Sequence, residues 1–521
     1  MSLNQRESHW APVAVMVLAL VARLAVLPFG TSDGGDAPSR VWIGWEWLDH
    51  PRLLTYGVWG PLHTYLIALT LRIVPDPVHA PVAMSVLFSV ASAGILYWFT
   101  RTEFDDSRAA LLVGLTYAVY PIAIRNGVSV RAETPFVFFM LLSMIAVGRV
   151  RAGAASWRLA AAAGLSLTLA SMLRYEAWVL IPIFGLLLRR QPRLLVTFMA
   201  FALLHPIFWS LGNWVHSGEP LYGFTAAARW ELQGMGRAQM SRRLLAAEAA
   251  GYPGTVMEGM SLPIGLLCVG GAAVALVARH RSRGWLLAAA GVLALWCIGI
   301  ARGALVPKVN YTEIAGTLLF PFSALAFQRL RIGQWRLERV VATAVALPLL
   351  SLLFSCKPCL ARVRLGRLAG PSPIPRIENQ ETALALAATL GNELRAEESL
   401  VSDFYGWGAT RYVALLTRLP RRRIFFAPGA PNQQLDTDSL AAFLAEHPHG
   451  VLIAASESRF TRLIGLNPEA THAAVGGASL DLVPMHTIGW QGPGHGTLMV
   501  FRYAVATDVG AGQRRERGLH Q

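Results

Sequence analysis

Long apolar runs constrain this chain more than any other feature of its sequence. A helix needs roughly 20 consecutive apolar residues to cross the hydrocarbon core of a bilayer, and many runs here meet or approach that length. Only 15% of the 521 residues are charged and 54% are hydrophobic, whereas about a quarter of a soluble chain is charged. The sequence therefore predicts an α-helical polytopic membrane protein.

Eleven segments are predicted to span the membrane. They are residues 12–29, 79–99, 108–124, 132–149, 158–172, 175–188, 193–212, 259–278, 284–301, 311–328 and 338–356. The first run contains Arg23 and lacks a small-residue cleavage site after it, so it is interpreted as a retained span rather than a signal peptide. The apolar stretch 61–74 is only about 14 residues long, which favours an interfacial or re-entrant helix. A full crossing by 61–74 stays open.

Arginine-rich connections predict the orientation of the spans. Basic residues gather at 149–158, 189–193, 279–283 and 329–339, and all four segments lie on one side if 61–74 does not cross. The positive-inside rule assigns that side to the cytoplasm. It also accounts for much of the formal net charge of +15, so no nucleic-acid partner is inferred. The expected location is the inner (plasma) membrane, with everything after Cys356 on the periplasmic or external side.

The sequence changes character beyond about residue 375. Helical patterns at 381–395, 410–417 and 439–446 alternate with strand-like runs at 399–403, 423–426 and 451–454. This alternation predicts a small C-terminal α/β domain with parallel strands, to which 480–483 and 497–503 are expected to add edge strands. The expected domains are a transmembrane domain at 1–360 with outer loops 30–60 and 213–258, an external α/β domain at 375–507, and a disordered tail at 508–521.

The unusual polar residues of the apolar part fall on the predicted outer face. They lie in five segments, residues 30–60, 125–133, 174–176, 213–258 and 302–311. Ionisable residues near membrane depth are costly and usually face a cavity or a partner. Their convergence predicts an external active site, whereas a transporter more often has its polar site at the membrane midplane.

Several short motifs on this face, taken in their order, resemble those of a known family. The motifs are Asp36 after the first span, Trp59-Gly60-Pro61-Leu62, Arg131-Ala132-Glu133-Thr134, Arg174-Tyr175-Glu176-Ala177-Trp178 and Ser217-Gly218-Glu219-Pro220-Leu221. They resemble the GT-C superfamily of membrane glycosyltransferases, above all the bacterial relatives of protein O-mannosyltransferases and lipid A aminoarabinose transferases. The resemblance covers about residues 12–360. Ala37 stands where relatives often carry a second acid, so the sugar and any metal stay open.

The resemblance implies transfer of a sugar from a polyprenyl-phosphate-linked donor to a glycan, lipid or protein acceptor on the external face. The acceptor must lose a proton, and a nearby carboxylate can take it; Asp36 is the first candidate for this base and Glu133 the second. The departing phosphate needs fixed cations, for which arginine is well suited. The candidate substrate-binding residues are Arg125, Arg131, Arg174, Glu176, Lys308 and Tyr311.

Each candidate also has a purely structural interpretation. Asp36 could cap a helix or pair with Arg40, and Glu133 could pair with Arg131 or Arg125. Arg174 and Glu176 could pair with each other. Lys308 and Tyr311 could be anchors at the membrane interface.

Other functions and cofactors are weighed in the same way. No His/Cys/Asp cluster has metal-ligand spacing, although a divalent cation held by Asp36 and another outer carboxylate stays open. No dinucleotide or phosphate-loop fingerprint is visible, which gives little support to a nucleotide-sugar donor. The alternative functions are a non-catalytic transporter or flippase for lipid-linked glycans, and an assembly subunit.

Overall fold

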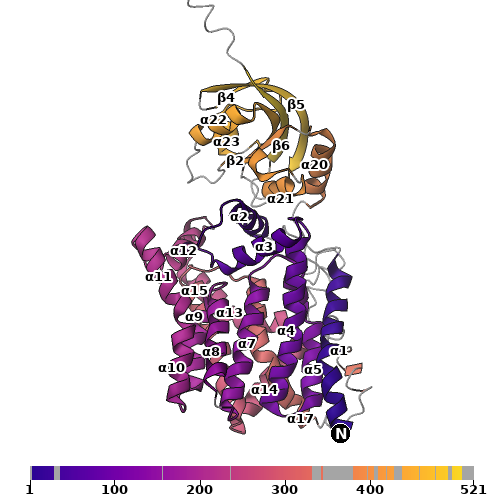
Figure 1. The fold of residues 1–521 in the computed structure, drawn as a ribbon, viewed down its shortest axis with the longest axis vertical. Helices are drawn as coiled ribbons and strands as arrows, with labels where there is room; N and C mark the ends of the chain where they lie inside the picture. Colours follow the sequence, from indigo (N-terminus) through magenta and orange to yellow (C-terminus); the bar gives the residue numbers. More distant parts are fainter. Residues whose placement is uncertain are drawn as a thin grey trace, which may run out of the picture. The chain divides into compact units, whose positions relative to one another are not determined.

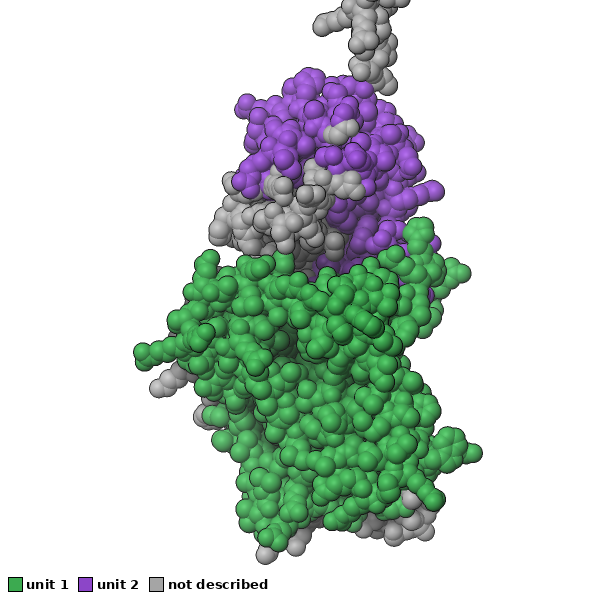
Figure 2. Space-filling model, turned by 90° about the vertical axis from the view of Figure 1, so that its left-hand side faces the viewer, with its two compact units in different colours: residues 1–31, 50–73, 80–375 green, residues 32–49, 74–79, 376–521 purple. Residues whose placement is uncertain are grey.

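The computed structural model of the chain describes residues 3–27, 36–154, 156–234, 236–330, 339, 342, 343, 346, 380–395, 397–403, 409–417, 419–427, 437–456, 458–475, 477–490 and 496–506. The chain divides into two compact units, distinguished by colour in Figure 2. The helical unit comprises residues 1–31, 50–73 and 80–375, and the sheet unit comprises residues 32–49, 74–79 and 376–521. The first outer loop is thus divided between the two units.

Helices occupy every predicted span of the helical unit that the structure describes. Their bounds are α1 (Leu3–Val26), α3 (Leu62–Ile73), α4 (Ala80–Phe104), α5 (Ser107–Ala118), α6 (Pro121–Gly127), α7 (Glu133–Arg151), α8 (Trp157–Ser171), α9 (Glu176–Leu187), α10 (Pro192–Ala202), α11 (Leu204–Ser217), α12 (Tyr222–Gly234), α13 (Arg242–Met260), α14 (Leu262–Val277), α15 (Leu286–Ala301), α16 (Thr312–Leu319) and α17 (Ser323–Arg329), with short 3-10 turns at η2 (Arg237–Gln239), η3 (Arg281–Trp285), η4 (Val309–Tyr311) and η5 (Phe320–Phe322). The predicted span 338–356 and the predicted tail 508–521 lie outside the described residues, apart from four isolated positions of the former.

Length and composition identify four to six membrane spans within the described part of the chain. Four stretches qualify alone, Ala80–Phe104, Glu133–Arg151, Pro192–Ser217 and Arg281–Ala301. Two bent pairs could each form one broken span, α5 with α6 at 55° and α13 with α14 at 111°. Helix α3 and the apolar parts of α1 and α9 are shorter than these. The polytopic helical class is therefore observed, whereas the predicted count of eleven spans is not confirmed.

The long helices of this unit run alongside one another (Figure 1). The N-terminus and α17 lie at one end of the bundle, and α3 and α12 lie at the other (Figure 1). Glycines let the helices approach closely, as is common in membranes. A Cβ added at Gly164 of α8 would lie 2.4 Å from the carbonyl oxygen of Phe198 in α10, and one at Gly271 of α14 would lie 1.8 Å from that of Phe322.

Arg23 ties α1 into the bundle. Its side chain is fully buried and donates hydrogen bonds to Ser89 Oγ at 2.8 Å, the Ala19 carbonyl at 3.0 Å and the Ala118 carbonyl at 2.7 Å. A buried guanidinium is tolerated when such acceptors satisfy it. Helix α1, which carries Arg23, packs against α4 and α5.

The segment 213–258, expected as a loop, is largely helical. Ser241 caps α13 by accepting a hydrogen bond from the Leu244 amide at 3.3 Å, as serine often does at this position. Tyr252, Val256 and Met260 then recur on one buried face of α13, at the spacing of an amphipathic helix. This periodicity was the signal that a loop interpretation overlooked.

The sheet unit is built on one six-stranded sheet. Its strands are β1 (Ser399–Asp403), β2 (Ile424–Ala427), β3 (His449–Ala455), β4 (His472–Val475), β5 (Ala478–Trp490) and β6 (Gly496–Val505), in the order β2-β1-β3-β6-β5-β4. Its helices are α2 (Ala37–Asp49), α20 (Gln380–Glu393), α21 (Ala409–Leu416), α22 (Thr437–Glu446) and α23 (Arg459–Leu463), with a 3-10 turn η7 (Arg421–Arg423).

The first three strands are parallel, as the alternating pattern predicts. Val401 of β1 faces Phe425 of β2 and Leu452 of β3 in register. The expectation that 480–483 and 497–503 form edge strands is wrong. Strand β6 pairs antiparallel with both β3 and β5, and β5 also pairs with β4. The sequence shows that a segment is a strand, but its place in the sheet depends on long-range pairing.

Candidate functional site

Three of the predicted outer segments meet around one arginine of the helical unit. Arg174 lies in the turn between α8 and α9, where its guanidinium contacts Glu176 through two hydrogen bonds of 2.7 and 3.1 Å. The same group reaches Glu133 at 3.1 Å and lies over the ring of Tyr311, 4.3 Å from its centroid. We call Glu133, Arg174, Glu176, Asn310 and Tyr311 the charged cluster.

Both acids of the charged cluster begin a helix. Glu133 is the first residue of α7 and Glu176 the first of α9, so the positive ends of two helix dipoles stabilise the carboxylates. The two residues are 4% and 5% exposed. Burial alone lowers the pKa of Arg174, but Glu176 and Glu133 reverse that effect and raise the pKa above its ordinary value. Arg174 is therefore a permanent cation shared by two acids.

The packing of α3 and of the loop before it fixes the turn that carries Arg174. The Leu62 amide donates a hydrogen bond of 3.1 Å to the Met172 carbonyl. A Cβ at Gly60 would lie only 2.2 Å from that carbonyl oxygen, so the approach requires glycine. The adjacent Tyr175 accepts a hydrogen bond of 3.1 Å from Trp209. The Trp59-Gly60-Pro61-Leu62 motif thus packs against the turn that carries Arg174.

Asn126 and Glu313 extend the charged cluster, and the sequence analysis singled out neither of them nor Asn310. The Asn310 amide donates to Glu133, while the Asn126 amide donates to Glu313 at 2.7 Å and to the Asn310 carbonyl at 3.0 Å. Glu313 is 1% exposed and Asn126 fully buried. Because Glu313 begins an apolar run, the rule that intramembrane acids are functional or paired would have found it.

Lys308 lies at the edge of the charged cluster. Its ammonium reaches Glu231 of α12 at 3.5 Å and lies 5.8 Å from the centroid of the Tyr311 ring. Its backbone carbonyl accepts a hydrogen bond of 3.0 Å from Tyr252 of α13. Residues of the 213–258 segment therefore also converge on this region.

Arg125 and Arg131 form a second feature of the same unit. Arg125 lies in α6 and Arg131 just before α7, and both side chains are partly buried. The Nε atom of each is buried and has no hydrogen-bond partner among the described residues. The positive charge of Arg131 acts unfavourably on that of Arg125. Glu133, for which pairing with one of these arginines was the structural alternative, contacts Arg174 and Asn310.

Asp36 belongs to the sheet unit. It is exposed and immediately precedes α2, and its carbonyl accepts the first helical hydrogen bond from the Arg40 amide at 3.0 Å. The candidate base is therefore joined to α2 through the backbone, while the charged cluster belongs to the helical unit.

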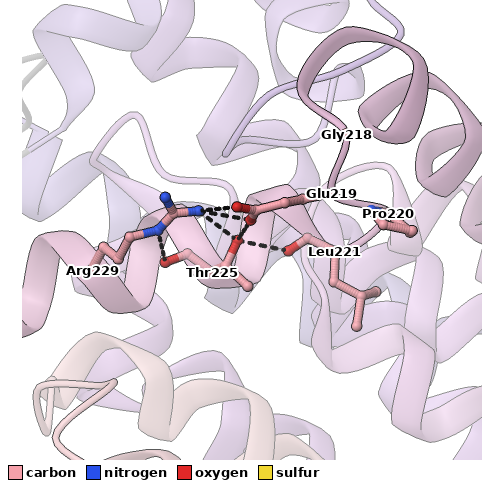
Figure 3. A pocket seen from close by; sticks show the side chains of 6 residues that line it. All are labelled: Gly218, Glu219, Pro220, Leu221, Thr225 and Arg229. Carbon is pink, nitrogen blue, oxygen red and sulfur yellow. Dashed lines mark hydrogen bonds and ion pairs between the residues drawn. The ribbon is translucent and has the colours of Figure 1, made fainter.

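The Ser217-Gly218-Glu219-Pro220-Leu221 motif borders an open hollow of about 600 Å³ (Figure 3). Gly218 ends α11 in the left-handed conformation, with φ of 73°, which suits glycine. Glu219 accepts a hydrogen bond of 2.5 Å from Thr225 and another of 2.7 Å from Arg229. These bonds lower the pKa of Glu219. The lining residues include none of the charged cluster, so this motif shapes a loop apart from it.

Among the described residues, no three His, Cys, Asp or Glu side chains come together as ligands for a metal ion. Cys268 and Cys297 are free thiols in α14 and α15, and only Cys268 is fully buried.

Comparison with known proteins finds one matching family and several similar solved structures. Residues 49–211 match the family of dolichyl-phosphate-mannose-protein mannosyltransferases. No curated protein matches the sequence. Among solved structures, ArnT from Cupriavidus metallidurans bound to undecaprenyl phosphate is similar with a TM-score of 0.60 and 12% identity, covering 94% of this chain and 97% of that chain. The apo state of the same protein is similar with a TM-score of 0.59 and 13% identity, covering 95% of this chain and 98% of that chain. The Archaeoglobus fulgidus oligosaccharyltransferase has a TM-score of 0.49 and 13% identity, covering 86% of this chain and 69% of that chain.

The bundle of apolar helices and the fold it shares with ArnT define the class, a polytopic integral membrane protein with an additional sheet unit. Within that class, the matches confirm the resemblance to the GT-C superfamily of membrane glycosyltransferases that the motifs indicate.

Proposed function

We propose that the protein transfers a sugar from a polyprenyl-phosphate-linked donor to a glycan, lipid or protein acceptor on the external face of the inner membrane. The observation that carries this proposal is the pair Arg125 and Arg131, two neighbouring cations whose buried Nε atoms have no acceptor among the described residues. A buried charge normally has a partner. A phosphate fits this arrangement because a guanidinium binds its oxygens in bidentate geometry.

Arg174 has a different part in this proposal. Its guanidinium is already shared between Glu133 and Glu176, so it holds the two acids in place and leaves Arg125 and Arg131 to bind the carrier phosphate. Trp296 supports the same arrangement by donating to Glu176 at 3.2 Å. Tyr311 of the charged cluster and Lys308 at its edge, which contacts α12 and α13, complete the substrate-binding residues.

Asp36 is the stronger of the two candidates for the base. One oxygen of Glu133 already accepts from both Arg174 and Asn310, whereas Asp36 is exposed. The acceptor hydroxyl or amine would give its proton to Asp36 as its oxygen or nitrogen attacks the anomeric carbon. The bond between that carbon and the phosphate oxygen breaks, the polyprenyl phosphate leaves with the electron pair of that bond, and the anomeric centre is inverted.

The first test compares binding with chemistry in purified, reconstituted protein. Asp36→Asn should lower kcat by about 100-fold or more while polyprenyl phosphate binds as in the wild type. Arg125→Gln with Arg131→Gln should weaken polyprenyl phosphate binding by about 10-fold or more, because two charge-assisted bonds are lost. Arg190→Gln is the matched control, since Arg190 is an exposed arginine of the same unit.

Full transfer activity of Asp36→Asn with the correct donor would overturn the assignment of the base. A protein that binds polyprenyl phosphate through Arg125 and Arg131 but transfers no sugar from any lipid-linked donor would instead have the alternative function, movement of lipid-linked glycans without chemistry.

A further inference from the structure

The helix that follows Asp36 is clamped by the C-terminal part of the sheet unit. Helix α2 packs against α21, and the ring of Trp42 meets that of Phe426 in β2 edge to face, 4.6 Å between centroids. Trp42 is 7% exposed and Val41 fully buried. Two chain segments far apart in sequence therefore form one packed structure within this unit.

Arg421 joins the two segments by three contacts. Its guanidinium reaches Glu46 at 2.9 Å and Asp49 at 3.2 Å, and its central carbon lies 5.9 Å from the centroid of the Trp42 ring. A single exposed ion pair contributes little to stability. Here, however, one guanidinium bridges two carboxylates and also lies against an aromatic ring, so it fixes the direction of α2 as well as its position.

The direction of α2 decides where Asp36 lies. Asp36 accepts the first helical hydrogen bond of α2, so it moves with the helix. Ten residues separate it from Glu46, which is roughly 15 Å along a helix. A tilt of about 4° at the clamped end would then displace Asp36 by about 1 Å, and a displacement of that size can slow a positioned reaction by about 100-fold.

We infer that Arg421 is a positioning residue for the transfer reaction: by holding Glu46, Asp49 and Trp42, it sets the direction of α2 and so the place of Asp36. This inference rests on the proposed function, in which Asp36 is the base. It gives the C-terminal sheet a part in the reaction, as the rigid support of a residue that lies near the other end of the sequence.

The test uses the full-length protein and two neighbouring arginines. Arg421→Ala should lower kcat by about 10-fold while KM for the lipid-linked donor stays within about 2-fold, because orientation is lost and not binding. Arg422→Ala, a change at an exposed position of the same turn, should leave both unchanged. Amide hydrogen exchange across residues 37–49 should become faster in Arg421→Ala only.

A charge exchange separates positioning from a general effect on folding. Arg421→Glu combined with Glu46→Arg restores one opposite-charge pair, so it should recover part of kcat and of the exchange protection. If Arg421→Ala does not fold, the double variant Glu46→Ala Asp49→Ala removes the same contacts from the helix side and should show the same loss. A wild-type kcat in whichever of these variants folds, or a lower kcat without faster exchange in α2, would overturn the inference.

Failure of the proposed function would look different. If Asp36→Asn transfers sugar at the wild-type rate, Asp36 is not the base, whatever Arg421→Ala does to kcat. If Asp36→Asn is inactive while Arg421→Ala remains fully active, the positioning inference alone is wrong.

Discussion

At the scale of single residues, the charged cluster depends on one cation. Arg174 neutralises two acids that are almost completely buried, and a buried charge without its partner is among the most destabilising defects in a protein. Asn310 and Trp296 add neutral hydrogen bonds to the same carboxylates, but they cannot replace the charge.

We therefore expect Arg174→Gln to destabilise the helical unit by about 3–5 kcal/mol. The measurement is the apparent unfolding temperature in detergent, with Arg190→Gln as the surface control. Adding Glu133→Gln and Glu176→Gln to Arg174→Gln removes both orphaned charges and should recover part of the loss. Equal unfolding temperatures for Arg174→Gln and wild type would show that the acids find another partner.

At the scale of elements, small residues determine which helices pack together. Gly271 of α14 faces the backbone of η5, whereas the next residue back, Gly270, has no atom within 4 Å of the position of its absent Cβ. The two glycines share a helix and differ only in the face they occupy. Sequence alone cannot distinguish them, because both lie in the same apolar run.

This pair yields a matched prediction. Gly271→Ala should destabilise the protein by about 1–3 kcal/mol, since α14 must move away from Phe322 to admit a methyl group. Gly270→Ala should be neutral or slightly stabilising, because alanine favours the helix. Thermal unfolding of both variants in one detergent tests this, and equal unfolding temperatures would contradict the packing of α14 against η5.

At the scale of the whole molecule, the orientation in the membrane follows from charge. The exposed arginines Arg189 and Arg190 follow α9, whereas Glu219 follows α11. The positive-inside rule assigns the arginines to the cytoplasm, and the predicted topology assigns Glu219 to the opposite side. The charged cluster and the residues around it share that outer side in the predicted topology.

Cysteine labelling in intact cells tests this orientation. In a background without the four native cysteines, Glu219→Cys should react with a membrane-impermeant maleimide from outside. Arg190→Cys should react only after the membrane is permeabilised, because the positive-inside rule assigns its segment to the cytoplasm. The cysteine-free background is the control. Labelling of both positions from the same side would mean that residues 193–212 do not cross the membrane. Labelling of Arg190→Cys from outside, with Glu219→Cys protected, would mean that the orientation, and with it the assignment of 61–74, is wrong.

The sequence by itself determined the class of this protein and most of its elements. A bilayer demands long apolar helices, so the runs that predict spans coincide with α1, α4, α7 and α15. Strand and helix periods are equally local, which is why β1, β2 and β3 were found in the C-terminal part. The same local reading identified Glu133, Arg174 and Glu176 as candidates, because charges in apolar surroundings stand out.

Only the tertiary structure decided which of these residues meet. Glu133 bonds to Asn310 177 positions away, and Asn126 bonds to Glu313 187 positions away. The clamp from Arg421 to Asp49 spans 372 positions. Such contacts depend on how helices and strands pack, which no local period encodes. The sequence therefore supplied the charges and the helices, while packing made Arg174 the centre of a cluster and Arg421 the support of α2.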